Sequence, residues 1–228
     1  MPKITTLLSA SLLLLSFSSA NAATTLYTSE AAFLNDLDPS RTVTQNFEGF
    51  TPGGIIPSGS IHAGATFVYD IPGVSIMVDN YFDTTSPGNY LGTDDGSGAF
   101  LGGDEFTLNF DQTIHAVGMY LISADYIYPG DFTITTNMGQ SVSNIDIPSL
   151  SLTDGEAYYL GLIENDLSLG FNSITLSSYP ENYLFNVDDI TVSAVPEPST
   201  LLLFGLGLLS VVGMSRRKAN QNITMQSV

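Results

Sequence analysis

Apolar and polar side chains alternate with a period of two along most of the chain, a pattern typical of half-buried β-strands. The clearest case is Phe106–Phe110, where Phe and Leu alternate with Thr and Asn. The same pattern predicts further strands at Val43–Phe47, Thr66–Tyr69, Val74–Val78, Ala116–Ile122, Asp131–Thr136, Tyr158–Ile163, Ser173–Ser177 and Phe185–Val192. Clusters of Gly, Pro, Asn and Asp separate these segments at short intervals, as turns between strands require. The sequence therefore predicts an all-β fold, most simply a jelly-roll β-sandwich.

One segment near the start has helical rather than strand spacing. Thr28 or Ser29 is a suitable N-cap, and Ala32, Phe33 and Leu37 are spaced to face inward from a helix that follows it. The sequence between the two ends of the chain shows no linker and no fixed-period repeat. We therefore expect one β-sandwich domain, residues 23–194, with one short N-terminal helix.

The N-terminus has the layout of a secretory signal peptide. Lys3 supplies the positive charge, Leu7–Phe17 is the apolar stretch, and Ala20-Asn21-Ala22 forms a small-residue cleavage site. A transmembrane anchor is the alternative, but the apolar run is short and small residues follow it. We expect residues 1–22 to be removed, so that the exported chain begins at Ala23.

The C-terminal tail, residues 195–228, combines three features in a fixed order. They are the Pro196-Glu197-Pro198 motif, an uncharged apolar stretch at about 200–214, and a basic end made of Arg216, Arg217 and Lys218. As a helix the apolar stretch is roughly 22 Å long, against a hydrocarbon core of about 30 Å, so flanking residues and local thinning of the bilayer must close the gap for it to span. The positive-inside rule keeps the basic end cytoplasmic. The alternative is a buried core helix, against which the basic end argues.

This tail resembles the PEP-CTERM sorting signal of exported proteins in Gram-negative bacteria that make exopolysaccharide. The resemblance implies export through the inner membrane and transient anchoring there by a C-terminal transmembrane helix in the precursor. It also implies cleavage near Pro196–Pro198 by an exosortase-type membrane protease, followed by residence at the cell surface or in the extracellular matrix. The chain departs from the pattern in the residues that follow Lys218, because such tails usually stop soon after the basic end.

The charge of the exported part excludes one class of partner. Arg41 is the only Lys or Arg between the two export signals, whereas all 23 acidic residues lie between Glu30 and Glu197. Such a surface repels phosphate backbones, which excludes nucleic acid. It suits divalent cations held by oxygen ligands, or it merely keeps the exported domain soluble. The absence of cysteine excludes disulfides, cysteine–zinc sites and thiol catalysis.

Two short segments carry a second resemblance. Asn46–Phe50 (NFEGF) and Phe185–Val192 (FNVDDITV) are similar to the first and last strands of jelly-roll domains such as carbohydrate-binding-module-like and MAM-like proteins. The resemblance implies that these strands lie together and that Glu48 and Asp189, with Asp188 as a further candidate ligand, share a structural calcium ion. The alternative is that both aspartates end a strand in solvent. A second acidic segment, residues 92–105, lacks the ligand spacing of an EF-hand loop and is better explained as a surface loop.

Aromatic side chains supply the candidate binding surface. Tyr81, Tyr126 and Tyr128 lie in turn-rich segments beside Asp and Asn, and sugars bind to proteins by stacking on such rings with their hydroxyls paired at the rim. No evidence for catalysis is found: His62 and His115 have no evident partners, and no G-x-S-x-G motif occurs. We therefore expect no enzyme.

Three hypotheses follow for the whole chain. The first is an exported surface or matrix protein that binds exopolysaccharide or is embedded in it. The second is a structural surface protein stabilised by calcium without specific glycan recognition. A glycan-cleaving enzyme is the third.

Overall fold

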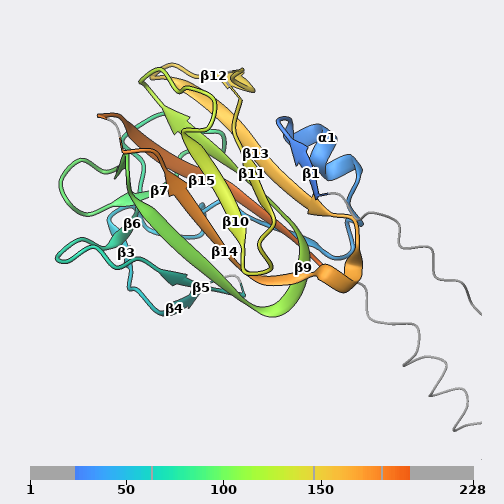
Figure 1. Cartoon of the computed structure of the whole chain (residues 1–228). Coiled ribbons are helices and arrows are strands. Elements are labelled where there is room, and N and C mark those ends of the chain that lie inside the picture. The colour runs from blue at the N-terminus through green and yellow to red at the C-terminus, as the bar shows by residue number, and fades with distance from the viewer. Residues whose placement is uncertain (1–23, 63, 146, 181, 196–228) are drawn as a thin grey trace, which may run out of the picture.

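The structure, a computed structural model, describes residues 24–62, 64–145, 147–180 and 182–195 (Figure 1). The predicted signal peptide, the Pro196–Pro198 motif, the predicted transmembrane helix and the basic end all lie outside these residues. Within the described ranges, no helix has the length and apolar character needed to cross a membrane.

The regular secondary structure of the described residues is almost entirely β-strand, which confirms the all-β prediction with one short N-terminal helix. The helices are α1 (Glu30–Asn35) and a 3-10 turn, η1 (Leu167–Leu169). The strands are β1 (Thr24–Tyr27), β2 (Thr42–Gln45), β3 (Gly54–Ile56), β4 (Ser60–His62), β5 (Ala65–Val68), β6 (Ile76–Asp79), β7 (Tyr90–Thr93), β8 (Phe100–Leu101), β9 (Glu105–Ser123), β10 (Phe132–Thr136), β11 (Ser141–Ser143), β12 (Leu150–Ser151), β13 (Glu156–Glu164), β14 (Phe171–Ser178) and β15 (Leu184–Ala194).

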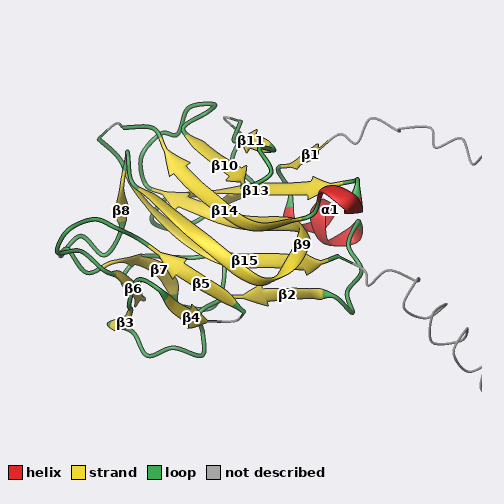
Figure 2. Ribbon diagram, turned by 60° about the horizontal axis from the view of Figure 1, so that its bottom comes forward, coloured by secondary structure: helices red, strands yellow, loops and turns green. Residues whose placement is uncertain are grey.

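A single long strand, β9, belongs to both layers of the sandwich. Its first part, Glu105–Phe110, pairs antiparallel with β5 and β14, and β10 and β11 extend that sheet. Its second part, Ile114–Ser123, pairs with β13 and β15, and β2, β7, β6 and β3 continue that second sheet (Figure 2). The sequence predicts two strands here, at Phe106–Phe110 and Ala116–Ile122. The structure joins them because the exposed polar residues between them stay extended.

The main hydrophobic core lies between the two sheets. Phe67, Leu108 and Ile134 come from the first sheet, and Val117 and Leu160 come from the second. In β13 alternate side chains point to opposite faces, yet nearly the whole strand is buried. Both faces of the second sheet are therefore covered, the inner one by the first sheet and the outer one by other segments.

Helix α1 covers part of that outer face. Ser29 caps it, as one of the two candidates predicted: its hydroxyl accepts from the backbone N–H of Ala32. Phe33 and Leu37 are buried against Ala116, Tyr159 and the rest of a second cluster. Ala32, which the sequence also predicts to face inward, is exposed. Phe33 and Leu37 are four residues apart and share the buried side, and Ala32 lies beside that side.

The first and last strands of the sequence pattern lie side by side. β2 pairs with β15, with Gln45 opposite Ile190. The predicted strand at Val43–Phe47 is too long, because β2 ends at Gln45 and Phe47 takes a left-handed conformation with φ of 60° in the turn that follows. All the described strands, α1 and both clusters lie within residues 24–195, so we expect this segment to fold on its own.

Candidate functional site

The turn after β2, strand β15 and one loop bring three acidic side chains together, and we call Glu48, Asp188 and Asp189 the carboxylate cluster. Glu48 lies in the turn after β2, and the two aspartates lie in β15. The loop Asn80–Asn89, between β6 and β7, provides the hydrogen bonds that link them.

Asp188 is completely buried and densely hydrogen-bonded. Its Oδ2 accepts from the hydroxyls of Thr84 (2.5 Å), Thr85 (3.1 Å) and Ser86 (2.8 Å), and from the backbone N–H of Ser86 (3.0 Å). Burial nevertheless raises the pKa of this carboxyl, although these hydrogen bonds act in the opposite direction. The Asp188 side chain thus fastens the loop to β15.

Asp189 shares this environment because the strand is irregular. A β-bulge interrupts the pairing of β15 with β9 after Asp188, and Asp189 has a φ of 49°. In a regular strand neighbouring side chains point to opposite faces, whereas here Thr85 Oγ1 lies within 3.1 Å of Asp188 Oδ2 and 2.9 Å of Asp189 Oδ2. Burial, and then the charge of Asp188, raise the pKa of Asp189 to about 6.

Glu48 differs from the two aspartates because it is exposed. Its Oε1 accepts from the backbone N–H groups of Gly88 (3.0 Å) and Asn89 (2.8 Å), and from the Ser86 hydroxyl (3.2 Å). The hydrogen bond from Asn89 is the main cause that lowers its pKa. Ser86 Oγ therefore lies within hydrogen-bond distance of both Glu48 and Asp188, and its single proton donates to one of them at a time.

The donor set of the carboxylate cluster consists of oxygen atoms, the ligands that Ca²⁺ prefers. No basic side chain is among its hydrogen-bond partners in the described residues. As they stand, no three His, Cys, Asp or Glu side chains of the described residues are close enough to hold a metal ion. A calcium ion at the carboxylate cluster would therefore require carboxyl oxygens to exchange their hydroxyl partners for the ion.

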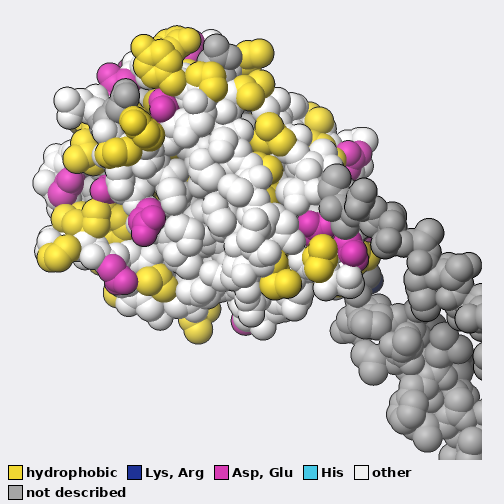
Figure 3. Space-filling model, viewed as in Figure 1, with side chains coloured by type: hydrophobic (Ala, Val, Ile, Leu, Met, Phe, Trp, Pro, Cys, Tyr) yellow, Lys and Arg dark blue, Asp and Glu magenta, His cyan; other side chains and the backbone are white. Residues whose placement is uncertain are grey.

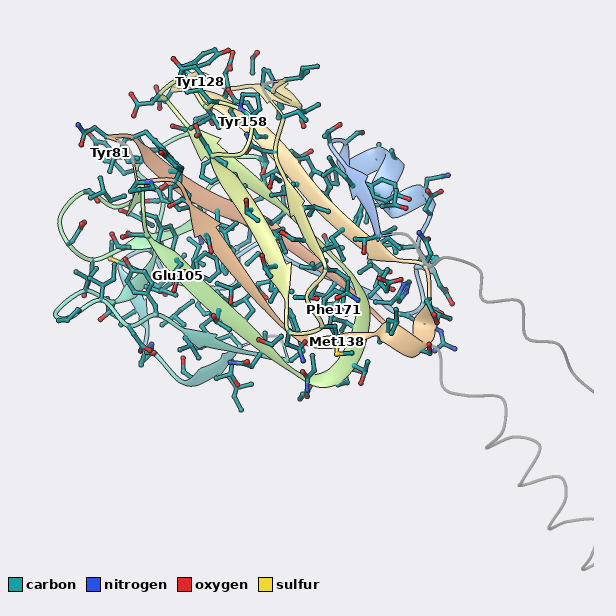
Figure 4. All side chains as sticks on the ribbon, in the orientation of Figure 1. Tyr81, Glu105, Tyr128, Met138, Tyr158 and Phe171 are labelled. Carbon is teal, nitrogen blue, oxygen red and sulfur yellow. The ribbon has the colours of Figure 1, made fainter. Side chains whose placement is uncertain are left out.

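The three tyrosines predicted to bind ligand are all exposed. The exposed fractions are 79% for Tyr81, 61% for Tyr126 and 56% for Tyr128. The rings of Tyr126 and Tyr128 contact each other edge to face at 4.7 Å. Figure 4 shows Tyr81 and Tyr128 at the same end of the sandwich, opposite the end that carries Phe171.

A pocket of about 100 Å³ lies between the segments that carry these tyrosines. Phe82 and Asp83 form one wall, next to Tyr81, and Ser123, Ala124 and Asp125 form another, next to Tyr126. Asp154, Ala99, Ile122, Leu184 and Asn186 complete the lining. We call this cavity the acidic pocket, because Asp83, Asp125 and Asp154 are its charged residues. Figure 3 shows hydrophobic side chains gathered at this end of the molecule, with acidic side chains among them.

Hydrogen bonds hold the walls of the acidic pocket in place. Asp83 Oδ2 accepts from the backbone N–H of Thr153 at 2.8 Å, which ties two loops together and lowers the Asp83 pKa. The Ser123 hydroxyl donates to the carbonyl of Leu184 at 2.7 Å and accepts from the backbone N–H of Asp125. The pocket is therefore formed before any ligand binds.

Asn186 lines the acidic pocket and is only 4% exposed, yet its Oδ1 has no hydrogen-bond partner. Buried polar atoms are usually paired, so an orphan beside a cavity indicates a place for a ligand or water. The sequence predicted neither Asn186 nor the pocket. Asn186 lies between buried residues of a strand covered on both faces, so its neighbours in sequence give no sign of the cavity.

The two histidines and the acidic segment 92–105 contact neighbouring parts of the fold. His62 lies between the rings of Phe50 and Phe67 and contacts the Ser60 hydroxyl. Burial lowers the pKa of His115. In the acidic segment 92–105, Asp95 accepts hydrogen bonds from the Ser97 backbone and hydroxyl groups of its own loop.

Comparison with known proteins identifies the C-terminal tail. Residues 194–218 match the PEP-CTERM protein-sorting motif, and all but the first two of them lie outside the described residues. The motif marks an exported protein that is anchored in the membrane during sorting. It implies processing by an exosortase, a membrane protein, as the sequence predicts.

Outside the tail the comparisons are sparse. No curated protein matches the chain. Among solved structures, the chain is similar to the K2 cleaved adhesin domain of Lys-gingipain, at 13% identity and a TM-score of 0.44. That match covers 67% of this chain and 99% of the adhesin domain, and at this distance it carries no inference about function.

Proposed function

We propose that this exported protein acts at the cell surface or in the extracellular matrix and binds exopolysaccharide there through the acidic pocket and its flanking tyrosines. The tail supports the destination, because it addresses the chain to an exosortase system. The single observation that carries the binding proposal is the pocket itself, with the unpaired Asn186 oxygen between two tyrosine-bearing segments.

The chemistry of this surface suits a sugar. The exposed rings of Tyr81 and Tyr126 offer flat faces for the CH groups of a sugar ring. Carboxylate oxygens at the pocket accept hydrogen bonds from hydroxyl groups, and the apolar side chains of Phe82 and Ile122 exclude water from the remainder.

Co-sedimentation of residues 24–195 with the producing organism's own exopolysaccharide tests this proposal. We expect saturable binding that Tyr81→Ala and Tyr126→Ala weaken at least fivefold. Tyr179→Ala is the matched control, because Tyr179 is 57% exposed but, unlike Tyr81 and Tyr126, has no pocket-lining residue next to it in the sequence. Absence of saturable binding, or equal weakening by the control, would contradict the proposal.

A structural role for calcium is a second candidate, favoured by the carboxylate cluster. Burial raises the pKa of Asp188 and Asp189, and the charge of Asp188 raises that of Asp189 further, so a cation there would stabilise the ionised carboxylates. About 1 mM calcium should then raise the melting temperature of the wild type, since a ligand selective for the folded state stabilises it. Glu48→Gln and Asp189→Asn should remove the rise, whereas Asp111→Asn, which changes an exposed acid elsewhere, should keep it. No rise in the wild type would exclude a calcium site.

We propose a binding protein rather than an enzyme. Glycoside hydrolysis requires one carboxyl group with a raised pKa beside the substrate. The carboxyl groups with raised pKa values, Asp188 and Asp189, do not line the acidic pocket, and the pKa of Asp83 within it is lowered. Release of reducing sugar from the exopolysaccharide by the purified protein would contradict this conclusion.

A further inference from the structure

The polar groups of the acidic pocket point to the charge of its ligand. The side chains of Asp83, Asp125 and Asp154 and the unpaired oxygen of Asn186 are all hydrogen-bond acceptors. An ionised carboxylate accepts and never donates. A ligand that satisfies this pocket must therefore bring donors.

Several of the donors beside the pocket are already engaged. The backbone N–H groups of Thr84 and Thr153 donate to Asp83, and that of Leu184 donates to Asp125. The Ser123 hydroxyl donates to a backbone carbonyl. These bonds leave the groups concerned with no proton to offer a ligand.

No basic side chain lines the pocket to balance its three carboxyl groups. Arg41, the only Lys or Arg of the exported part, pairs with Asp38 instead. The pocket therefore attracts a cation and repels an anion, which disfavours sugars that carry carboxylate or sulfate groups.

The size and apolar lining of the pocket favour an organic cation over a bare metal ion. A cavity of about 100 Å³ is several times the volume of one water molecule, about 30 Å³. Phe82, Ile122 and Leu184 supply apolar contacts for carbon atoms. No acidic trio of the described residues is close enough to hold a metal ion. A primary ammonium group, with three donors and an attached carbon skeleton, meets each of these conditions.

We propose that the acidic pocket binds the protonated amino group of an unacetylated amino-sugar residue in a polysaccharide. This inference rests on the proposed function, because it names the class of glycan that the same site takes. The tyrosines beside the pocket favour a sugar over a lysine side chain, since a sugar ring has the broader CH face to place on them.

Calorimetric titration of residues 24–195 at about pH 6, where a sugar amine is largely protonated, tests the inference. The probes are a glucosamine tetramer, its fully N-acetylated form, a neutral glucose tetramer and a lysine-containing peptide. We expect the free-amine tetramer to bind at least tenfold more tightly than each of the others. Equal binding of the acetylated or neutral tetramer would overturn the ammonium assignment, and equal binding of the peptide would overturn the glycan assignment.

Substitutions locate the effect. Asp154→Asn removes a charge from an exposed side chain with no hydrogen bond in the described residues, so it leaves the fold intact and should weaken free-amine binding about fivefold. Asp111→Asn makes the same charge change away from the pocket and should have no effect. Equal weakening by both would mean general attraction to the acidic surface and would overturn the pocket assignment. Asn186→Leu should abolish the preference for the free amine, and an unchanged preference would equally count against the inference.

Failure of this inference can be separated from failure of the proposed function. If no tetramer binds but the organism's exopolysaccharide still co-sediments with the protein, the ammonium assignment fails and the binding function stands. If neither binds, both fail.

Discussion

Replacing Asp189 with Asn should stabilise the calcium-free protein at neutral pH. Burial and the nearby charge of Asp188 raise the pKa of Asp189 from 3.8 to about 6. A rise of roughly two pH units corresponds to about 3 kcal/mol of unfavourable free energy for the ionised carboxyl in the folded state. Because the side chain is only partly buried and water screens some of the repulsion, we expect a gain of about 2 kcal/mol.

Asn suits this position in two further respects. Its side-chain oxygen still accepts the hydrogen bond from Thr85, and Asn tolerates the left-handed backbone that Asp189 adopts with a φ of 49°. The substitution therefore changes the charge with little change in shape or backbone strain.

The gain from Asp189→Asn should depend on pH with a definite sign. The folded-state pKa lies above the unfolded one, so the folded wild type binds more protons, and this contribution to stability is lost as pH rises from about 4 to beyond about 6. The variant lacks the titration. The difference in unfolding free energy should be near zero at about pH 4 and complete by about pH 7.

Urea unfolding of residues 24–195, followed by tyrosine fluorescence in the presence of chelator, measures this difference. Asp111→Asn is the matched control, because it removes one carboxylate from an exposed position. Comparing each variant with the wild type at the same pH cancels the titration of His115. A variant no more stable than the wild type at pH 7, or a gain that does not change with pH, would refute the electrostatic reasoning.

Three further substitutions probe the fold. Gly161→Ala places a Cβ atom 2.9 Å from a ring carbon of Phe33 and should lower the free energy of unfolding by about 1–3 kcal/mol. Gly49→Ala is its control, because a Cβ atom there has nothing within 4 Å and should leave the melting temperature nearly unchanged. Equal effects of the two substitutions would contradict the packing argument. Asn89→Ala removes two hydrogen bonds to backbone carbonyls of the turn after β2 and should cost about 1–3 kcal/mol in urea unfolding, so an unchanged midpoint would count against it. Because burial lowers the pKa of His115, its contribution to stability falls as pH drops below about 6.5, and His115→Phe should lose less stability than the wild type between pH 7 and 5.

The periodicity of the sequence predicted the fold class correctly but did not predict where the strands begin and end. Alternation located the sandwich, and the hydroxyl at Ser29 located the start of α1. Continuity of β9 was missed, because three polar residues look like a turn unless the pairing partners are known. Likewise Phe47 fits the alternation, yet its left-handed backbone is set by the tertiary contacts of the turn. Local pattern cannot reveal such contacts.

For the candidate site, the sequence indicated the residues at the ends of the chain but not what joins them. The resemblance of the first and last strands pointed to Glu48, Asp188 and Asp189, and the structure places all three around one loop. Nothing in the segment Thr84–Asn89 shows that its hydroxyls contact residues a hundred positions away. The acidic pocket was missed for the same reason, since it is assembled from separate loops.

The loop Asn80–Asn89 contributes to both proposed sites, so we expect it to couple them. Phe82 and Asp83 line the acidic pocket, and the next residue, Thr84, donates to Asp188. If calcium binds the carboxylate cluster, it must displace some of these hydroxyl contacts, and we expect the pocket wall to respond.

Linkage then requires that glycan change calcium affinity by the same factor as calcium changes glycan affinity. The glycan affinity is measured in calcium and in chelator, and the calcium affinity with and without glycan. The two affinity ratios should be equal and should differ from one. Ratios of one in both directions would mean that the pocket wall is held independently of the cluster, by the bond from Thr153 to Asp83.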